Sequence, residues 1–345
     1  MAGTSTPELA AAVSNAGGMG SLGLGNLSVE AARAQIRQLQ ALTDNAFNIN
    51  FFCHQPEPAD ATRDQAWLQR LTPWFSLFNA QPPAQLEAGY DSFTDNRAML
   101  DMLLEERPPV VSFHFGVPDA EAIAALHAAG ILLMGCATSL AEAQLIEAAG
   151  LDAVIAQGYE AGGHRGLFDP QHEPALGLLA LLDQLQGALS LPVIAAGGLM
   201  DGKDMAAALA RGACAAQLGT AFISCPESAA PAAYRAHLLS ERAEHTRVTA
   251  IFSGRPARGI VNRSHREIGP HAAELAGYPQ AYSAAKALHA AAAAQDCHEF
   301  APYWAGTGAH RSRALPAAQL VATLMHELTG TGWGPAPVQT PSAAL

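Results

Sequence analysis

The stretch PVIAAGGLM (192–200) carries the clearest indication of the fold, because a short apolar run ends there in two glycines. One unit later, QLGTAF (217–222) has the same order, an apolar run followed by Gly219 and Thr220. Between the two, the residues from Asp201 or Asp204 to Gly212 have the pattern of a helix with a capped start and a glycine end. A repeated strand, glycine turn and helix is typical of βα units around a parallel sheet.

The same alternation extends back to the N-terminus and predicts seven strands. Several are almost continuously apolar, as expected for strands that are covered on both faces. Helix starts are predicted at Thr6–Pro7, Asp119 and Ser139, each followed by an apolar helical pattern. The predicted strands are Met19–Leu22, Phe47–Phe52, Val110–Phe115, Ile131–Cys136, Asp152–Gln157, Val193–Ala196 and Ala215–Leu218.

A (β/α)₈ barrel has eight strands. The pattern therefore predicts a TIM barrel whose first strand is missing from this numbering, although an open doubly wound sheet would also accommodate seven strands. The alternation stops near Pro226. We predict a βα barrel over residues 1–225 and a mostly helical appendage over 226–345, interrupted by GRPARG (254–259) and YWAGTG (303–308). The Pro-rich tail after Gly330 is expected to be frayed.

Composition excludes several classes of protein. Among 345 residues, 31 are acidic and 19 basic, giving a net charge of −12, which argues against nucleic-acid binding. The five cysteines form no CxxC pair, so a disulfide framework or a metal site is not expected. No apolar run reaches the roughly 18 residues of a membrane helix, and no leader pattern is visible. We predict a cytoplasmic protein with no membrane partner.

The two glycine-bearing strand ends predict a phosphate site. In βα barrels the loops after the seventh and eighth strands often hold a phosphate, because glycines bring backbone N–H groups close to it. Counting the absent first strand, Gly197–Gly198 and Gly219–Thr220 follow those two strands. The alternative is that these glycines only make tight turns.

A second glycine-rich loop, AQGYEAGGHRG (156–166), follows the predicted sixth strand of a complete barrel. It places His164 at the rim, where an imidazole can exchange a proton near neutral pH. Arg165 is expected to supply positive potential there. The alternative is an ordinary surface-loop histidine. Asn48 and Asn50 share one face of their strand, and Asn50 is either a ligand contact or a strand-end cap.

The string AQGYEAGGHRG resembles the signature of the class I nitronate monooxygenases, formerly called 2-nitropropane dioxygenases, which are FMN-dependent (β/α)₈ enzymes. Further motifs similar to those of the family span nearly the whole chain. The resemblance implies a strand before position 1, and it implies glutamine where this chain has Thr307. The motifs are MAG (1–3), TPELAAAVSNAGGMGSLG (6–23), NINFF (48–52), PVIAAGG (192–198), QLGTAF (217–222), GRPARG (254–259) and WAGTG (304–308).

The resemblance also implies roles for individual residues. His164 matches the catalytic histidine, and Tyr303 and Trp304 are expected on the substrate side. The residues expected to bind FMN are Met1, Ala2, Gly3, Asn50, Gln157, Gly162 and Gly163 around the flavin, and Gly197, Gly198, Gln217, Leu218, Gly219 and Thr220 around its phosphate.

The expected reaction is FMN-dependent oxidation of alkyl nitronates, such as propionate 3-nitronate, with O₂ to a carbonyl compound and nitrite. His164 would either hold the anionic substrate or remove the α-proton of a neutral nitroalkane. Two alternatives remain: an FMN-dependent enoyl reductase or NAD(P)H:quinone reductase on the same barrel, and a flavin-binding protein without turnover. The expected partners are the small nitronate and O₂, with the protein a monomer or homodimer.

Overall fold

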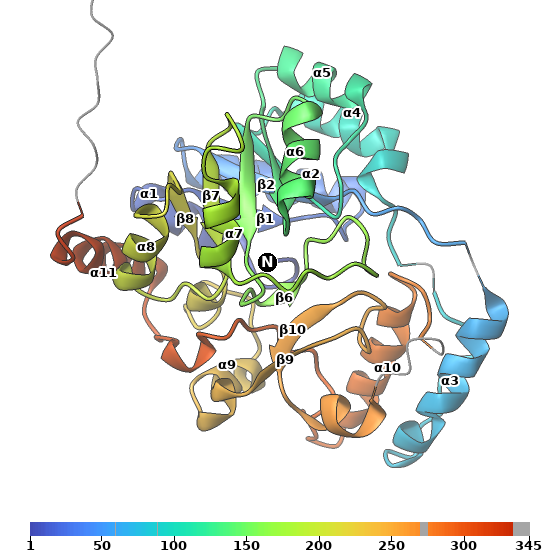
Figure 1. Cartoon of the computed structure of the whole chain (residues 1–345). Coiled ribbons are helices and arrows are strands. Elements are labelled where there is room, and N and C mark those ends of the chain that lie inside the picture. The colour runs from blue at the N-terminus through green and yellow to red at the C-terminus, as the bar shows by residue number, and fades with distance from the viewer. Residues whose placement is uncertain (59, 88, 270–274, 334–345) are drawn as a thin grey trace, which may run out of the picture.

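Seven parallel strands form a curled sheet in the order in which they occur along the chain (Figure 1). The computed structural model describes residues 1–58, 60–87, 89–269 and 275–333. A doubly wound sheet reverses its strand order at one point, and this sheet has no reversal, so that alternative is wrong and the TIM-barrel arrangement is confirmed. The strands are β1 (Gly20–Gly23), β2 (Phe47–Phe52), β3 (Val110–His114), β4 (Leu132–Ala137), β5 (Ala153–Gln157), β7 (Val193–Ala196) and β8 (Ala215–Gln217).

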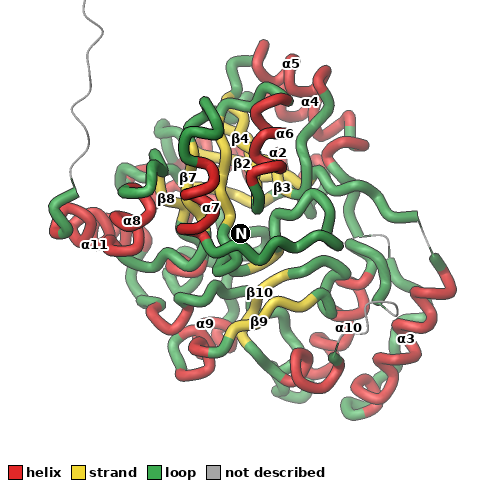
Figure 2. The backbone as a smooth tube through the Cα atoms, in the orientation of Figure 1, coloured by secondary structure: helices red, strands yellow, loops and turns green. Residues whose placement is uncertain are grey.

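All seven predicted strands are confirmed, with ends that differ by one residue or none. Helices follow the strands and cover the outside of the sheet (Figure 2). Thr6, Asp119, Ser139 and Asp201 each accept a backbone N–H at a helix start, as predicted, and such a cap stabilises a helix by about 1 kcal/mol. The barrel helices are α1 (Pro7–Asn15), α2 (Val29–Leu42), α4 (Arg97–Glu106), α5 (Ala120–Ala128), α6 (Leu140–Ala148), α7 (Leu178–Leu185) and α8 (Gly202–Leu209).

The two faces of the sheet differ in chemistry. Outward-facing residues such as Ile49, Val111 and Val154 are fully buried in the core between strands and helices. Inside the barrel, Val110 belongs to an apolar cluster with Met134 and Ile155. Two and four residues further along β3, the inner positions become Ser112 and His114. Along β3 the interior therefore changes from apolar to polar towards the carboxyl end of the strand.

A second, three-stranded antiparallel sheet lies beside the barrel and was not predicted. It consists of β6 (Gly163–His164), β10 (Ala257–Ile260) and β9 (Thr246–Thr249), in that order. His164 pairs with Ala257, so the GRPARG motif lies next to the histidine loop. β6 has two residues, too few to give an alternating pattern, and β9 and β10 lie where the regular alternation of strands and helices has stopped, so the sequence did not indicate them.

The C-terminal segment contributes α9 (Ala232–Leu238), α10 (Ala281–Ala293) and α11 (Ala317–Gly330). The helix α3 (Ala61–Ser76) lies between β2 and β3 in sequence but packs against α10, burying Trp67 and Phe75 with Leu288 (Figure 1). The domain division at residue 225 stays a proposal. Most of the tail predicted to be frayed, residues 334–345, lies outside the described residues. Within the described ranges, no helix is long and apolar enough to cross a membrane.

Candidate active site

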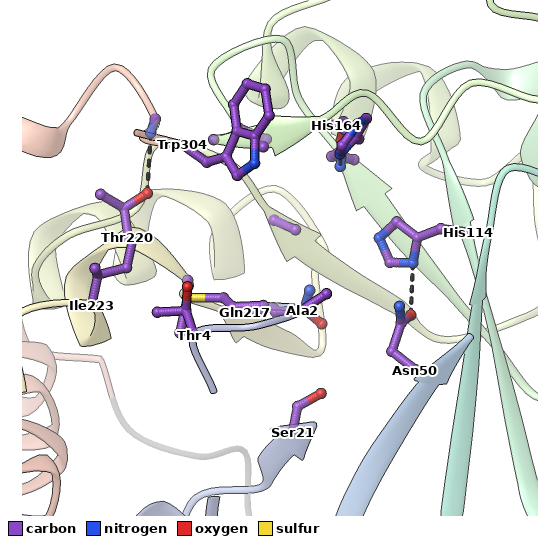
Figure 3. Close-up of a pocket in the computed structure, with 18 of the residues that line it drawn as sticks. Ala2, Thr4, Ser21, Asn50, His114, His164, Gln217, Thr220, Ile223 and Trp304 are labelled. Carbon is purple, nitrogen blue, oxygen red and sulfur yellow. Dashed lines mark hydrogen bonds between the residues drawn. The ribbon is translucent and has the colours of Figure 1, made fainter. Parts of the chain in front are cut away.

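A cavity of about 520 Å³ opens at the carboxyl ends of the barrel strands. Figure 3 shows Asn50, His114 and His164 on one side of it, with Thr220 and Gln217 on the other. The cavity brings together most of the residues singled out from the sequence. They are Met1, Ala2, Gly3, Asn50, Gln157, Gly162, Gly163, His164, Gly197, Gly198, Gln217, Gly219, Thr220 and Trp304.

Leu218 and Tyr303 are not among the residues that line this cavity. Side chains alternate along a strand, so Leu218 points away from the face that carries Gln217 and packs against the surrounding apolar cores. Tyr303 is 4% exposed, and its ring stacks on Tyr234 with centroids 5.0 Å apart. Both side chains therefore support the wall of the cavity from behind.

The glycines permit a close approach between the cavity loops and the C-terminal segment. Gly197 and Gly198 have φ values of +123° and +72°, which residues with a side chain rarely adopt. A Cβ on Gly162 would lie 2.4 Å from the backbone nitrogen of Gly306. That same nitrogen donates to Thr220 Oγ1 over 3.0 Å. Since this bond uses a lone pair, the Thr220 hydroxyl hydrogen remains available to a ligand.

A row of polar side chains crosses the inner face of β1, β2 and β3. Asn48 Nδ2 donates to Ser21 Oγ over 2.8 Å and to Ser112 Oγ over 2.9 Å, and Ser112 donates to Asn50 Oδ1 over 2.8 Å. Asn48 Oδ1 is buried without a partner among the described residues. Buried polar atoms are usually satisfied, so this unpaired oxygen indicates a site for a polar ligand.

His114 ends this row and was missed by the sequence analysis. Its Nδ1 lies 2.8 Å from Asn50 Oδ1, an oxygen that can only accept (Figure 3). Nδ1 therefore carries the hydrogen, and Nε2 is an acceptor. Burial lowers the pKa of His114 to about 4, so the ring is neutral at pH 7. The signal that could have identified it is its position. His114 is a polar residue at the end of an apolar strand, much as Asn50 is a polar residue near the end of β2.

His164 lies among aromatic rings in the opposite wall. Its Nε2 is 2.8 Å from Ser253 Oγ. The rings of Phe115, Tyr278 and Trp304 have centroids 6.0, 5.9 and 5.3 Å from the imidazole. Burial, the Arg255 charge and His114 lower the pKa of His164 to about 3. The imidazole is therefore neutral across the physiological range.

Comparison with known proteins identifies the family. The sequence profile described as nitronate monooxygenase matches residues 1–327. A nitronate monooxygenase of Pseudomonas aeruginosa is 53% identical over 332 residues, covering 96% of this chain and 95% of the relative. One of Paraburkholderia phytofirmans is 54% identical over 331 residues, covering 95% of this chain and 90% of the relative.

The chain belongs to the nitronate monooxygenase family. It is therefore an enzyme, and the resemblance inferred from its motifs is confirmed. Among solved structures, a nitroalkane oxidase from Streptomyces ansochromogenes has a TM-score of 0.88 and 42% identity, covering 96% of this chain and 94% of its own. FabK from Thermotoga maritima has a TM-score of 0.71 and 27% identity, with coverages of 96% and 91%.

The source of positive charge in this nitronate monooxygenase family member differs from the expectation. Arg165 is fully buried and donates to Glu173, to Gln157 Oε1 over 2.7 Å and to the carbonyl of Gly158 over 2.7 Å. It does not line the cavity. The expected role of Arg165 in attracting an anion is therefore wrong, because its charge is paired with a carboxylate behind the loop.

Lys286 on α10 lines the cavity instead, with its ammonium 5.0 Å from the centre of the Tyr282 ring. No sequence pattern indicated Lys286, because it lies in an Ala-rich helix far from any glycine loop. Thr307, which stands where the family resemblance implies glutamine, is exposed and does not line this cavity. Its backbone N–H donates to the carbonyl of Glu160 over 3.0 Å.

Proposed function

We propose that this protein binds FMN in the cavity and oxidises alkyl nitronates with O₂, producing a carbonyl compound and nitrite. Family membership supports the class of reaction. The single observation that carries the proposal is that one cavity joins the paired glycine loops, suited to a phosphate, with His164 and Lys286, suited to an organic anion. The one GxGxxG string, residues 18–23, leads into and forms β1, whereas a dinucleotide fingerprint follows a strand and opens a helix, so a mononucleotide fits better than a dinucleotide.

The residues present fit FMN. The cavity volume falls within the range of about 300–1,000 Å³ common for small-ligand sites. Gly198, Gly219 and the free hydroxyl hydrogen of Thr220 would hold the phosphate. The unpaired Asn48 Oδ1 and the neighbouring Asn50 amide would face the polar edge of the flavin. When bound, the flavin would accept electrons from the nitronate and pass them to O₂.

The protein's own part in the reaction is to hold the anion and keep water away. The whole-molecule charge of −12 repels a nitronate, so local groups must attract it. Lys286 supplies a cation at the cavity wall, and Trp304 with Tyr282 forms an apolar cover, joined by the Trp304 Nε1 hydrogen bond of 3.2 Å. We infer that His164 positions the nitronate, because an imidazole with a pKa of about 3 is a weak base for the α-proton of a nitroalkane.

The test is anaerobic mixing of the purified protein with propionate 3-nitronate and, separately, with NADH, followed by absorbance. The nitronate should bleach the flavin and NADH should not. Bleaching by NADH alone would instead identify a reductase, and a yellow protein inert to both would be a flavin-binding protein without turnover. Mass spectrometry of the released cofactor should give FMN, and FAD would contradict the mononucleotide site.

The cytoplasmic location and the monomeric or homodimeric state expected from the sequence stay predictions. Cell fractionation and light scattering of the purified protein would test them.

A further inference from the structure

The GRPARG segment contains a buried cation without a carboxylate partner. The Arg255 side chain belongs to a residue that is 4% exposed. Its Nη2 donates to the carbonyl of Leu167, and its Nε has no partner among the described residues. No described carboxylate forms an ion pair with it, whereas the nearby Arg165 pairs with Glu173 over 2.7 Å. Buried charges are normally paired, so a buried guanidinium without an ion pair is unusual.

Arg255 is connected to His164 by two routes. Its guanidinium lies over the Phe115 ring, 4.4 Å from the centroid, and 5.5 Å from that of Tyr278. Both rings also lie edge-on to the His164 imidazole, with centroids 6.0 and 5.9 Å away. In addition, Ser253 Oγ lies 2.8 Å from His164 Nε2 and accepts a hydrogen bond from the backbone N–H of Arg255 over 3.3 Å, so the Ser253 hydroxyl can donate to Nε2 and leave the ring hydrogen on Nδ1. The cation therefore stands directly behind the wall that carries the histidine.

We propose that Arg255 is a positioning residue whose buried charge favours an organic anion against His164 and keeps that imidazole neutral. Arg255 does not line the cavity, and the rings of Phe115 and Tyr278 each approach both its guanidinium and the histidine. A buried unpaired cation destabilises the protein until an anion enters its field. That the anion is a nitronate rests on the function proposed above.

A neutral His164 protects a bound nitronate from protonation. An imidazolium would donate its proton to a bound nitronate and convert it to the neutral nitroalkane. Burial first, then Arg255, then His114 hold the pKa of His164 low. The other titratable groups around the ring are the phenols of Tyr278 and Tyr282, whose pKa values burial raises, and the Lys286 ammonium at the cavity wall. No described carboxylate contacts His164, and the carboxylates whose charges act on Arg255 are Glu57 and Asp169, neither of which forms an ion pair with it.

The test compares Arg255→Met, which removes the charge, with Arg255→Lys, which keeps it. Arg258→Met is the matched control, because Arg258 is a second buried arginine of the same motif that bonds to the carbonyl of Tyr159 and lies over the Tyr159 ring. The first measurement is the His164 titration in the purified holoenzyme, by NMR of isotope-labelled histidine. Arg255→Met should raise the pKa of His164, while Arg255→Lys and Arg258→Met should leave it low.

The second measurement is the steady-state kinetics of propionate 3-nitronate. Arg255→Met should raise its KM roughly tenfold, as expected for loss of one nearby charge at an effective dielectric constant of about 20. Arg255→Lys should restore most of the affinity. Arg255→Met should also unfold at no lower temperature than the wild type, because the removed charge was unpaired.

An unchanged His164 titration in Arg255→Met would overturn the proposal. So would an Arg255→Lys variant that is as impaired as Arg255→Met, since that would show a role of shape and not of charge. If the wild type does not turn over nitronate at all, the proposed function fails. The NMR titration, together with the binding of nitrite as an anionic probe, would still test Arg255 in that case.

Discussion

The backbone nitrogen of Gly306 donates a hydrogen bond to Thr220 Oγ1 over 3.0 Å, although 86 positions separate the two residues. This bond fastens the C-terminal segment to the loop after β8. Arg311, a few residues further on, donates to the Gly198 carbonyl and pairs with Asp201 and Asp204 over 2.8 Å. The C-terminal segment therefore holds both glycine loops of the predicted phosphate site in place.

Gly219→Asp should weaken FMN binding much more than Gly219→Asn. A Cβ at this position would meet only the Met1 side chain, at 3.7 Å, and the backbone φ of −112° suits any residue. The two variants thus differ mainly in charge, and a carboxylate beside a phosphate is strongly repelled. We expect a loss of affinity of about 100-fold or more for Asp and about tenfold or less for Asn, measured by quenching of flavin fluorescence. Equal affinities would place the phosphate elsewhere.

Gly162→Ala should disturb the site more than Gly163→Ala. The added methyl group at Gly162 would lie 2.4 Å from Gly306 nitrogen and 2.6 Å from the Ala305 carbonyl carbon, so the C-terminal segment must move. At Gly163 the space is open, and only the φ of +77° opposes alanine, at about 1–2 kcal/mol. Gly162→Ala should unfold at a lower temperature in calorimetry and should retain less FMN than Gly163→Ala. The reverse order would contradict the contact between these segments.

His164→Asn should keep FMN and lose activity with preformed nitronate, chiefly through a higher KM. The reason is that the neutral imidazole is placed to hold the anion and, with a pKa of about 3, is poorly suited to proton abstraction. The wild type should accordingly act on preformed nitronates far better than on neutral nitroalkanes. Steady-state kinetics with the nitronate form and the neutral nitroalkane form of one compound will distinguish the two roles of His164. A variant that loses about 10²–10⁴-fold with nitroalkane alone would identify His164 as the base instead.

The protein should lose stability steadily as the pH falls below 6.5. Burial lowers the pKa values of His54, His114 and His265 to about 4 and that of His164 to about 3. Between pH 6.5 and 4 these rings are neutral in the folded protein but protonated in the unfolded chain, so protons favour unfolding. Each ring contributes up to about 1.4 kcal/mol per pH unit over that window.

Urea unfolding at a series of pH values would measure this slope. His54→Phe is a suitable comparison, because His54 packs edge-on against Tyr278, 4.9 Å between centroids, and its Nδ1 has no partner among the described residues. The variant should show a shallower slope between pH 6.5 and 4. Identical slopes would mean that His54 is not held neutral by the fold.

The barrel was predictable because its signals are local. A run such as Val193–Ala196 followed by glycines defines a strand and its turn without reference to the rest of the chain. The same locality explains why His164 and Gly219 were assigned to one rim: the carboxyl ends of parallel strands meet there. The predicted helix starts were confirmed for the same reason, since Thr6 and Ser139 cap residues only three positions away.

What could not be predicted depends on pairing between distant segments. Lys286 lines the cavity from α10, a helix outside the barrel, and nothing near Lys286 in sequence indicates that. Arg165 was expected to face the ligand because it follows His164, yet β6 turns it towards Glu173 and the interior. Adjacent residues in a strand point in opposite directions, and a two-residue strand gives no pattern from which to infer this.

The position of α3 has a consequence for the order in which the chain can fold. Its apolar face, with Trp67 and Phe75, is covered by Leu288 and Phe300, which are synthesised more than 200 residues later. Successive βα units can pack on one another as they leave the ribosome, whereas α3 must wait for nearly the whole polypeptide. A nascent chain that has completed the barrel strands therefore still exposes an apolar helix, and synthesis of α10 ends that period of vulnerability to aggregation.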